Sequence, residues 1–433
     1  MKTNEESILR EIIDKLLRNN NRKNDFAPKY WYPLNYATYG LDEILSTLDS
    51  LINFQTSMGS KTRLFEKRFS QFLGTIGSVF CNSGSSADLL AINSILKSPT
   101  TNLKIGDRVL VPAITWPTQV WSIIQCGLIP ILFDCSTESF NPDILSIPEE
   151  VLKDCKAIFT THILGCCSDI DTLIEICDKY KLELLEDSCE SLGAKYKGKF
   201  LGTFGKVATF STFFSHHMTT LEGGIVTSNF EDIFVQSKIS RAHGWSRGIS
   251  DEELKIFSQA RQIDLKDFEN IDNRYLFIDE GFNLRPTEIN ASFGIHQLDK
   301  LSKFNEIRKN LSNYFYNEIS SLNCLEGPKI VEGCEPCFMA LPLRIKNSNK
   351  KFQFAINFLE SHGIESRPLI AGNLIKHPAG VRSKMRSATN DLVGANYHHE
   401  KSFYVGLTPF HSEEDITKLI KTFEKLDQKL LVS

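Results

Sequence analysis

The sequence predicts an α/β fold, in which a mainly parallel sheet is covered by helices and is followed by a smaller α+β domain. Short apolar runs recur from about residue 79 to residue 227, and several are separated by segments long enough for a helix. Buried strands that alternate with helices form parallel sheets covered on both faces. After roughly residue 295 the sequence changes to long charged helices around a few strands. The 433 residues, 41% of them hydrophobic, are enough for a sizeable core.

The N-terminal segment predicts an amphipathic helix over residues 5–18, because apolar residues recur there at helical spacing. The polar run NNNRKND follows, so we interpret residues 1–35 as an accessory helical arm. A second helix is predicted over Arg63–Phe72 and leads into the short strand Val79–Cys81. Residues 82–96 then begin another helix.

The remaining elements divide the chain into two further parts. Six apolar runs are predicted as strands of the main sheet: Val109–Ile114, Ile129–Phe133, Ala157–Thr160, Leu182–Leu185, Val207–Ser211 and Ile225–Thr227. The C-terminal part is predicted to contain a few strands, such as Ala340–Ile345, and three long helices: Leu298–Ile319, Lys350–His362 and Glu413–Leu430. We therefore expect a large domain over residues 36–295 and a small domain over residues 296–433.

The composition favours small-molecule partners. The formal net charge is −4 and the basic residues are dispersed, so the chain lacks the electrostatic footprint of a nucleic-acid-binding protein. No apolar run has membrane-spanning length, and the charged N-terminus is unlike a signal peptide. Eleven cysteines, an odd number, predict free thiols in a reducing compartment, and we expect a cytoplasmic protein. The lone C-x-x-C at Cys334 and Cys337 has no second pair, so we predict no metal site.

Three polar clusters follow predicted strands. The first cluster lies where a strand ends and a helix begins, and reads Asn82-Ser83-Gly84-Ser85-Ser86-Ala87. A helix N-terminus with small residues can bind a phosphate, although Ser and Gly also make ordinary helix caps. In LLEDSCESLGA (184–194), Asp187 ends a strand, where an α/β sheet binds ligands. A buried carboxylate there needs a cationic partner, such as a protonated pyridine nitrogen, unless the residue only caps the next helix.

The third cluster is STFFSHHMTTLEGG at 211–224, in which Ser211 ends a strand and a Glu-Gly-Gly turn enters the next one. Together the clusters resemble the fold-type I, aspartate aminotransferase-like, pyridoxal-phosphate enzymes, specifically the sugar aminotransferase family named after DegT, DnrJ, EryC1 and StrS. The resemblance runs from about residue 35 to the C-terminus. Its patterns are N-S-G-[ST]-x-A, E-D-x-x-x-x-x-G and S-F-x-x-x-K-x-x-x-x-x-E-G-G.

The resemblance implies roles for individual residues. Two serines of the first cluster would belong to the phosphate loop, Asp187 would pair with the pyridine nitrogen, and Trp116 would stack on the cofactor face, although a tryptophan can also be core. In the family, a residue matching Asn283 reaches the phosphate from the partner subunit, which implies a homodimer. The cofactor-binding residues implied in this way are Ser85, Ser86, Trp116, Asp187, Glu190, Ser211 and Asn283.

The sequence departs from the family at the catalytic position. Six residues before Glu222, where the family has its Schiff-base lysine, stands His216, and no lysine lies between Lys206 and Lys238. Imidazole forms no stable Schiff base with an aldehyde but transfers protons near neutral pH. We therefore expect a non-covalently held cofactor with His216 as the catalytic base, while an inactive relative is the alternative.

This exchange resembles the nucleotide-sugar 3-dehydratases that make 3,6-dideoxyhexoses, in which HH-[MI]-T-x-x-EGG is a specific pattern. One branch acts on CDP-sugars, carries an iron–sulphur cluster and needs a reductase. The other, of the colitose type, acts on GDP-4-keto-6-deoxymannose and lacks the cluster. No cysteine occurs between Cys189 and Cys324, so the four thiolates of a [2Fe–2S] centre are missing after His216 and the second branch is favoured. The insertion at 246–273 has no assigned role.

The resemblance also implies the reaction. Glutamate would convert pyridoxal phosphate to pyridoxamine phosphate, whose amine condenses with the C4 ketone of the nucleotide sugar. His216 would then remove a proton from the cofactor so that the C3 hydroxyl of the sugar is lost, and hydrolysis would release ammonia and a 4-keto-3,6-dideoxy sugar. A nucleotide-sugar 4-aminotransferase and a non-catalytic regulator of the same fold remain the alternatives.

Overall fold

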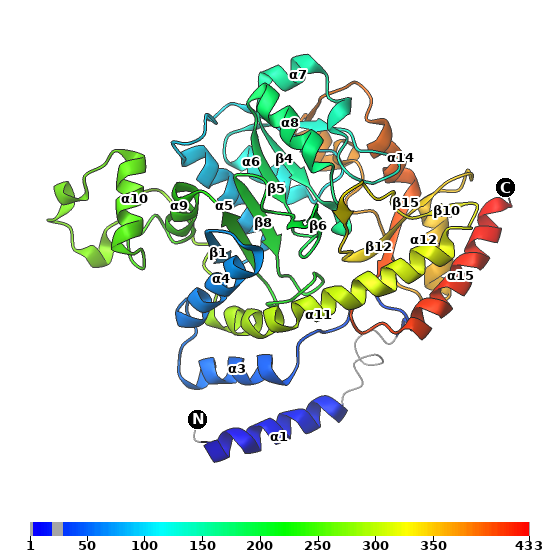
Figure 1. Cartoon of the computed structure of the whole chain (residues 1–433), viewed down its shortest axis with the longest axis horizontal. Helices are drawn as coiled ribbons and strands as arrows, with labels where there is room; N and C mark the ends of the chain where they lie inside the picture. Colours follow the sequence, from blue (N-terminus) through cyan, green and yellow to red (C-terminus); the bar gives the residue numbers. More distant parts are fainter. Residues whose placement is uncertain (1–2, 20–28, 433) are drawn as a thin grey trace.

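The computed structural model describes residues 3–19 and 29–432, and its centre is an eight-stranded sheet with helices on both faces (Figure 1). The strand order is β1-β9-β8-β5-β4-β2-β3-β14. The pairs from β8 to β14 are parallel, whereas β9 is antiparallel to both β1 and β8. The strands are Gly77–Cys81 (β1), Arg108–Pro112 (β2), Ile129–Phe133 (β3), Cys155–Thr161 (β4), Glu183–Asp187 (β5), Val207–Ser211 (β8), Gly224–Ser228 (β9) and Arg386–Ser387 (β14). The predicted mainly parallel sheet is confirmed.

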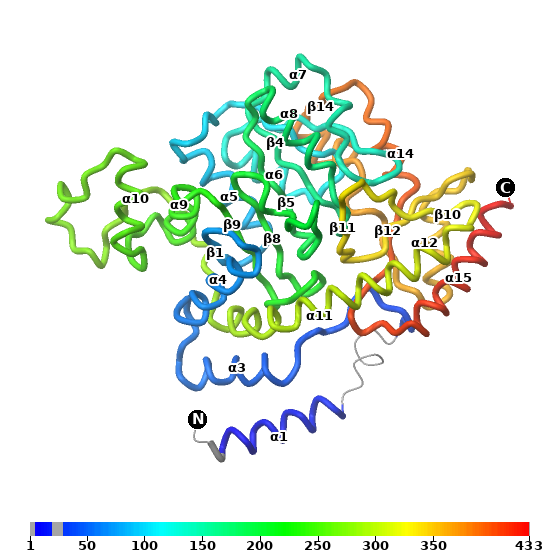
Figure 2. Tube along the Cα trace, viewed as in Figure 1, coloured from blue at the N-terminus to red at the C-terminus, as the bar shows by residue number. Residues whose placement is uncertain are grey.

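Alternation along each strand explains why both faces are covered. Val111 of β2 belongs to the core shared with α5 and α6, whereas its neighbour Leu110 belongs to the core on the other face, which includes Leu173 of α8. Figure 2 follows the trace through these layers. The surrounding helices are Ser60–Leu73 (α4), Gly84–Lys97 (α5), Pro117–Gln125 (α6), Glu149–Asp154 (α7), Ile170–Tyr180 (α8) and Glu231–Arg241 (α9).

A second, antiparallel sheet with the order β10-β12-β15-β13 builds the C-terminal part. Its strands pack with α12 and α15 around a separate core that includes Leu341, Phe403 and Phe423. The elements are Leu325–Glu326 (β10), Ala340–Ile345 (β12), Ser366–Pro368 (β13), Ser402–Gly406 (β15), Phe352–Ser361 (α12), Pro378–Arg382 (α13), Val393–Lys401 (α14) and Glu413–Leu431 (α15). A small third sheet joins Lys195–Tyr196 (β6), Lys199–Phe200 (β7) and Cys334–Glu335 (β11).

The long helix α11, Glu288–Ile319, connects the two cores. Its first half packs on α4, and its second half reaches α15 (Figure 1). It therefore runs across residue 295, where the predicted large domain ends. Strand β14 also returns from the C-terminal part to the edge of the main sheet. The division at 295 stays a prediction.

The N-terminal helix α1, Thr3–Asn19, lies beside α3, Leu41–Ile52 (Figure 1). The helix predicted over residues 5–18 is confirmed, whereas residues 1–2 and 20–28 of the predicted arm lie outside the described residues. Ile8, Ile12 and Leu16 form an apolar stripe that is more than half exposed.

The insertion folds into α10, Asp251–Arg261, whose first turn is closed by a capping box between Ser250 and Glu253. In Figure 1 it projects beyond α9, at the end of the molecule opposite α15. The partly buried ion pair between Lys238 and Glu253 joins it to α9.

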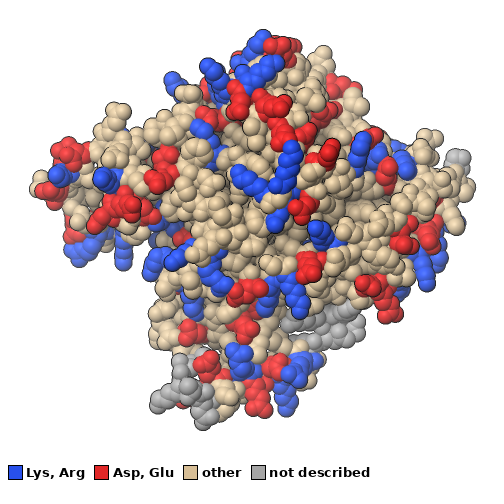
Figure 3. Space-filling model, in the orientation of Figure 1, with Lys and Arg blue, Asp and Glu red and all other residues tan. Residues whose placement is uncertain are grey.

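The surface carries both signs of charge. On the face in Figure 3, basic and acidic side chains are interspersed rather than gathered by sign. Within the described residues no helix combines the length and apolarity that a membrane crossing requires. All eleven cysteines are free thiols, as predicted, and most are buried.

Candidate active site

A cleft of about 410 Å³ lies where β5 and β8 end and α5 begins. This is the edge at which open α/β sheets bind ligands, and the volume is within the usual range of ligand pockets. The C-terminal part closes it with Met339, Ile370 and Tyr404. Six of the eight predicted site residues line it: Ser85, Trp116, Asp187, Glu190, Ser211 and His216.

One end of the cleft is the N-terminus of α5. Ser83 caps this helix by accepting a hydrogen bond from the Ser86 N–H at 3.1 Å, and its hydroxyl lies 3.0 Å from that of Ser86. Helix geometry leaves the N–H groups of Gly84 and Ser85 without intrahelical acceptors. They and the positive end of the helix dipole form an anion site. Ser86, a predicted phosphate residue, does not line the cleft and serves the cap instead.

Glycines bring the neighbouring strands against this helix end. A Cβ on Gly84 would lie 2.7 Å from the Cβ of Ser211. A Cβ on Gly224, in the Glu-Gly-Gly turn, would lie 2.1 Å from the Ser83 carbonyl oxygen. Only glycine permits this packing, so the turn fixes the position of the anion site.

Asp187 ends β5 and is only 3% exposed. Its carboxylate accepts a hydrogen bond from the Cys189 N–H at 3.0 Å. Burial raises the pKa of Asp187, and the hydrogen bonds from Cys189 oppose the shift. A cationic ligand atom beside this carboxylate would be stabilised.

The preceding residue, Glu186, points to the other face of the sheet. Its carboxylate accepts hydrogen bonds from the N–H groups of Gly202, Phe204 and Gly205 and lies 3.3 Å from His162 Nε2. Burial opposes ionisation, but these contacts prevail and lower the pKa of Glu186. The Asp187 carbonyl accepts a hydrogen bond from the His162 backbone N–H at 3.1 Å. Together with the contacts of Glu186, this bond holds the strand end that carries Asp187 in place.

The two adjacent histidines point in different directions. His217 is fully buried, and its Nε2 lies 2.9 Å from the Cys337 carbonyl oxygen, outside the cleft. His216 lines the cleft, with Phe213 against its ring at an interplanar angle of 74°. Burial lowers the pKa of His216 to about 4, although a hydrogen bond with the Cys189 backbone opposes the shift. The imidazole is therefore neutral at pH 7 and can accept a proton.

Two further predicted residues occupy the rim. Trp116 caps α6 and is 55% exposed, so its ring borders the cleft rather than the core. Glu190 is buried, accepts the Leu164 N–H at 2.8 Å, and has a pKa that burial raises to about 8. At neutral pH this carboxyl retains its proton and can act as a hydrogen-bond donor.

Asn283 lies on the surface, away from the cleft of its own chain. It forms an isolated bridge with Ala242, and its side-chain oxygen accepts a hydrogen bond from Arg285 at 3.0 Å. Asn283 does not line the cleft of this chain, and its contact with a cofactor phosphate stays a prediction.

Sequence reasoning missed Asp88, which lines the floor of the cleft from α5. The signal was its spacing, since Asp88 lies one helical turn after Gly84. With Asp187 and Cys189 it forms a group whose ligand atoms all lie within 4.8 Å of one another. Burial and both carboxyls raise the pKa of the Cys189 thiol well above its usual value, and a protonated thiol is a poor metal ligand.

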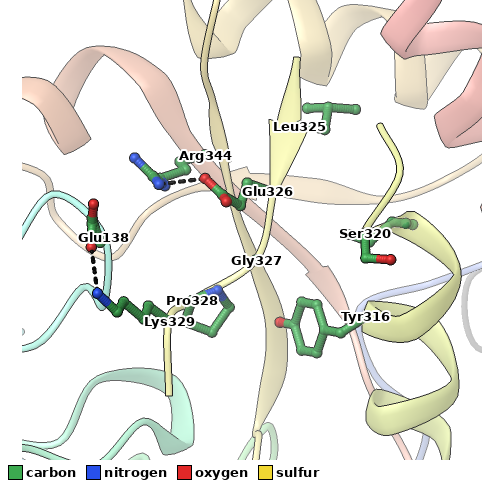
Figure 4. A pocket seen from close by; sticks show the side chains of 10 residues that line it. Glu138, Tyr316, Ser320, Leu325, Glu326, Gly327, Pro328, Lys329 and Arg344 are labelled. Atoms are coloured by element: carbon green, nitrogen blue, oxygen red, sulfur yellow. Dashed lines mark hydrogen bonds and ion pairs between the residues drawn. The ribbon is translucent and has the colours of Figure 1, made fainter. Parts of the chain in front are cut away.

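A separate hollow of about 470 Å³ lies beside β10 and the end of α11 (Figure 4). Its charged groups are already paired, Lys329 with Glu138 and Arg344 with Glu326. The Tyr316 hydroxyl donates to the Pro342 carbonyl at 3.1 Å. The cleft at β5, in contrast, presents ionisable groups that form no ion pair with any residue of the described ranges.

Comparison with known proteins agrees with this geometry. Residues 41–424 match the profile of the DegT/DnrJ/EryC1/StrS aminotransferase family. The chain belongs to this family. The family match spans both cores of the structure and every residue of the cleft.

Individual relatives are similar over nearly their whole length. GDP-4-keto-6-deoxy-D-mannose 3-dehydratase of Yersinia pseudotuberculosis is 30% identical over 396 residues, which cover 91% of this chain and 98% of the relative. A solved GDP-4-keto-6-deoxymannose-3-dehydratase, a histidine-to-asparagine variant with bound GDP-perosamine, superposes with a TM-score of 0.84 at 30% identity, covering 90% and 99% of the two chains. The Escherichia coli enzyme with bound hydrated PLP gives a TM-score of 0.80 at 30% identity, covering 91% and 99%.

Proposed function

We propose that the protein is a nucleotide-sugar 3-dehydratase that uses pyridoxal phosphate and pyridoxamine phosphate and acts on GDP-4-keto-6-deoxymannose. The observation that carries the proposal is that a neutral His216, and no lysine among the described residues, lines the cleft. An aminotransferase of this family needs a lysine amine at this place to hold its cofactor covalently. The names of the similar dehydratases support the same reaction.

The residues of the cleft fit this cofactor. The first-turn N–H groups of α5 and the Ser211 hydroxyl would bind the phosphate, since Gly84, Ser85 and Ser211 line the cleft together. Asp187 is a buried carboxylate that would keep the ring nitrogen protonated. Trp116 would cover one face of the ring. Pyridoxal phosphate then supplies an electron-withdrawing ring that stabilises negative charge on the adjoining carbon.

The chain's own part in the reaction is proton transfer and positioning. His216 accepts a proton at an imidazole nitrogen and can return it to the C3 oxygen of the sugar, so that this oxygen leaves as water. The protonated Glu190 can donate a hydrogen bond within the cleft. Glutamate supplies the electrons: one glutamate becomes 2-oxoglutarate and ammonia for each oxygen removed from the sugar.

An adjoining hollow of about 500 Å³ gives the substrate room. It shares Trp116, Phe213 and Tyr404 with the cleft and adds Arg367, which is half exposed and forms an ion pair with Glu365 at 2.7 Å. A guanidinium has several N–H donors, so Arg367 can pair with Glu365 and still bind a ligand. Guanidinium groups suit diphosphates, which supports a nucleotide-linked sugar. The preference for GDP rests on the similar enzymes.

The proposal includes a homodimer in the cytoplasm that works without a reductase. No Lys or Arg among the described residues lines the cleft of one chain, so Asn283 of a second chain would complete the phosphate site. The exposed stripe of α1 and Phe54, which is 91% exposed, supply apolar surface for such a contact. The free thiols support a reducing compartment.

A substrate panel tests the proposal. The protein, pyridoxal phosphate and glutamate are incubated with the GDP-, CDP- and dTDP-linked 4-keto-6-deoxy sugars, and 2-oxoglutarate, ammonia and the sugar product are measured. We expect equal amounts of all three products, with the highest kcat/KM for the GDP sugar. Turnover of none of the sugars would reject the function, and a preference for CDP or dTDP would reject only the nucleotide.

A further inference from the structure

Two carboxyl groups meet at the floor of the cleft, although one pyridine nitrogen would need only one. Asp88 reaches the floor from the first turns of α5, and Asp187 reaches it from the end of β5. Their exposed fractions are 2% and 3%, and their oxygens approach within 4.8 Å. Two ionised carboxylates at this distance, removed from water, repel each other strongly.

The surroundings give the pair no counter-charge. Neither carboxylate forms an ion pair with a described lysine, arginine or histidine. Asp187 acts on Asp88, and Asp88 in turn acts on the thiols of Cys189 and of Cys81 in β1. Asp187 also acts on Glu190, which retains its proton, and His162 acts on Asp187 from behind the sheet. If both carboxyls were ionised, the pair would carry an uncompensated charge of −2 in the cofactor-free cleft. With a pyridinium bound, an uncompensated charge of −1 would remain.

We propose that Asp88 and Asp187 hold one proton between them, carried by Asp88, so that Asp187 alone presents a negative charge to the ring nitrogen of the cofactor. Asp88 is then a positioning residue, since it acts through Asp187. This inference rests on the proposed function for the identity of the ligand, but the sharing of the proton is a property of the chain itself.

The hydrogen bonds distinguish the two groups. Asp187 accepts a backbone N–H from Cys189 at 3.0 Å, a fixed donor that favours the ionised form. Asp88 accepts a hydroxyl from Thr209 at 2.8 Å, which can rotate to suit either form. In agreement, burial and Asp187 raise the pKa of Asp88 well above its usual value, although its hydrogen bonds with Thr209 and Thr118 oppose the rise. Burial also raises the pKa of Asp187, where the hydrogen bonds from Cys189, and then His162, oppose the rise. The proton is thus held on Asp88.

Infrared spectroscopy of protein carrying ¹³C-labelled aspartate carboxyls tests the shared proton directly. At neutral pH the cofactor-free chain should display the C=O stretch of a protonated aspartic acid. The band should vanish in Asp88→Asn, and in Asp187→Asn it should titrate at a lower pH, because the repulsion is gone. Labelling only aspartate excludes Glu190, and Glu190→Gln, which should leave the band unchanged, is the matched control.

Cofactor affinity tests the consequence. Asp88→Asn, which imitates the protonated acid, should bind pyridoxal phosphate within about threefold of the wild type, whereas Asp187→Asn should weaken binding at least tenfold. Absence of the acid band from the wild type, or its persistence in Asp88→Asn, would overturn the proposal. Equal losses of affinity in the two variants would also overturn it. If the wild type binds no pyridoxal phosphate, the proposed function fails, while the infrared result still decides the protonation.

Discussion

His216 and His217 should respond to the same substitution in opposite ways. His216→Asn removes the base and should lower the dehydration rate by about 10²- to 10⁴-fold. Its Nδ1 has no hydrogen-bond partner in the structure and its ring lines the cleft, so the hydrogen bond lost is the one with the Cys189 backbone and the fold should be little affected. His217→Asn instead breaks the contact of Nε2 with the buried Cys337 carbonyl, while the rate should stay within about threefold.

The structure gives the size of the second effect. An unsatisfied buried carbonyl costs about 1–3 kcal/mol. With an unfolding entropy of about 2.1 cal/mol/K per residue, a chain of this length loses roughly 1 °C in Tm for each kcal/mol. His217→Asn should therefore melt about 1–3 °C below the wild type, and His216→Asn within about 1 °C of it.

The assay pairs initial rates of ammonia release with thermal melting of the same samples. Binding of pyridoxal phosphate, followed by its absorption, should be retained in both variants and serves as the control for an intact cleft. Wild-type turnover in His216→Asn, or complete loss of turnover in His217→Asn at an unchanged Tm, would refute the assignment of the base.

Three other predictions follow from the cleft. Burial lowers the pKa of His216 to about 4, and the base works only when it is neutral. As the pH is lowered, kcat/KM should therefore begin to fall nearer pH 4 than pH 6.5. A fall centred at pH 6.5 or above would contradict the lowered pKa. Gly224→Ala places a Cβ against the Ser83 carbonyl and should weaken pyridoxal phosphate binding at least tenfold by titration, whereas Gly74→Ala, at a helix end with open space, should not. Asn283→Ala should weaken cofactor binding without unfolding the chain. A mixed dimer of Asn283→Ala and His216→Asn chains should contain one intact active site and should therefore recover part of the activity. No recovery on mixing would indicate that the active species is a monomer.

Much of the fold follows from local patterns. Three strands were predicted with the bounds that the structure has: Ile129–Phe133, Val207–Ser211 and Ala340–Ile345. Each is a short apolar run flanked by polar turns, which is typical of a buried strand. The two-residue strand β14 could not be predicted. It pairs with β3, which lies more than 250 residues earlier in the chain, at the edge of the sheet. Its local sequence does not indicate this pairing.

The candidate site, like the fold, could be predicted only in part from the sequence. Asp187, Ser211 and His216 follow strand ends or lie at a fixed distance from the glycine turn, so the sequence places them in one cleft. Ser86 does not line the cleft, and its role at the phosphate stays a prediction. A serine at a helix N-terminus can take part in the helix cap as well as bind an anion, and local sequence does not separate the two uses. Tyr404 comes from the C-terminal part of the chain and reaches the cleft only through tertiary packing, whereas Asp88 was missed although its spacing from Gly84 offered a local signal.

The central claim is that the protein removes an oxygen from a nucleotide sugar without a lysine. A single-turnover reaction tests it most directly: protein loaded with pyridoxamine phosphate is mixed with GDP-4-keto-6-deoxymannose in the absence of glutamate, and the sugar product is identified by mass spectrometry. We expect one equivalent of a product lacking one oxygen atom and one equivalent of free ammonia per site. An amino sugar, with no ammonia released, would contradict it.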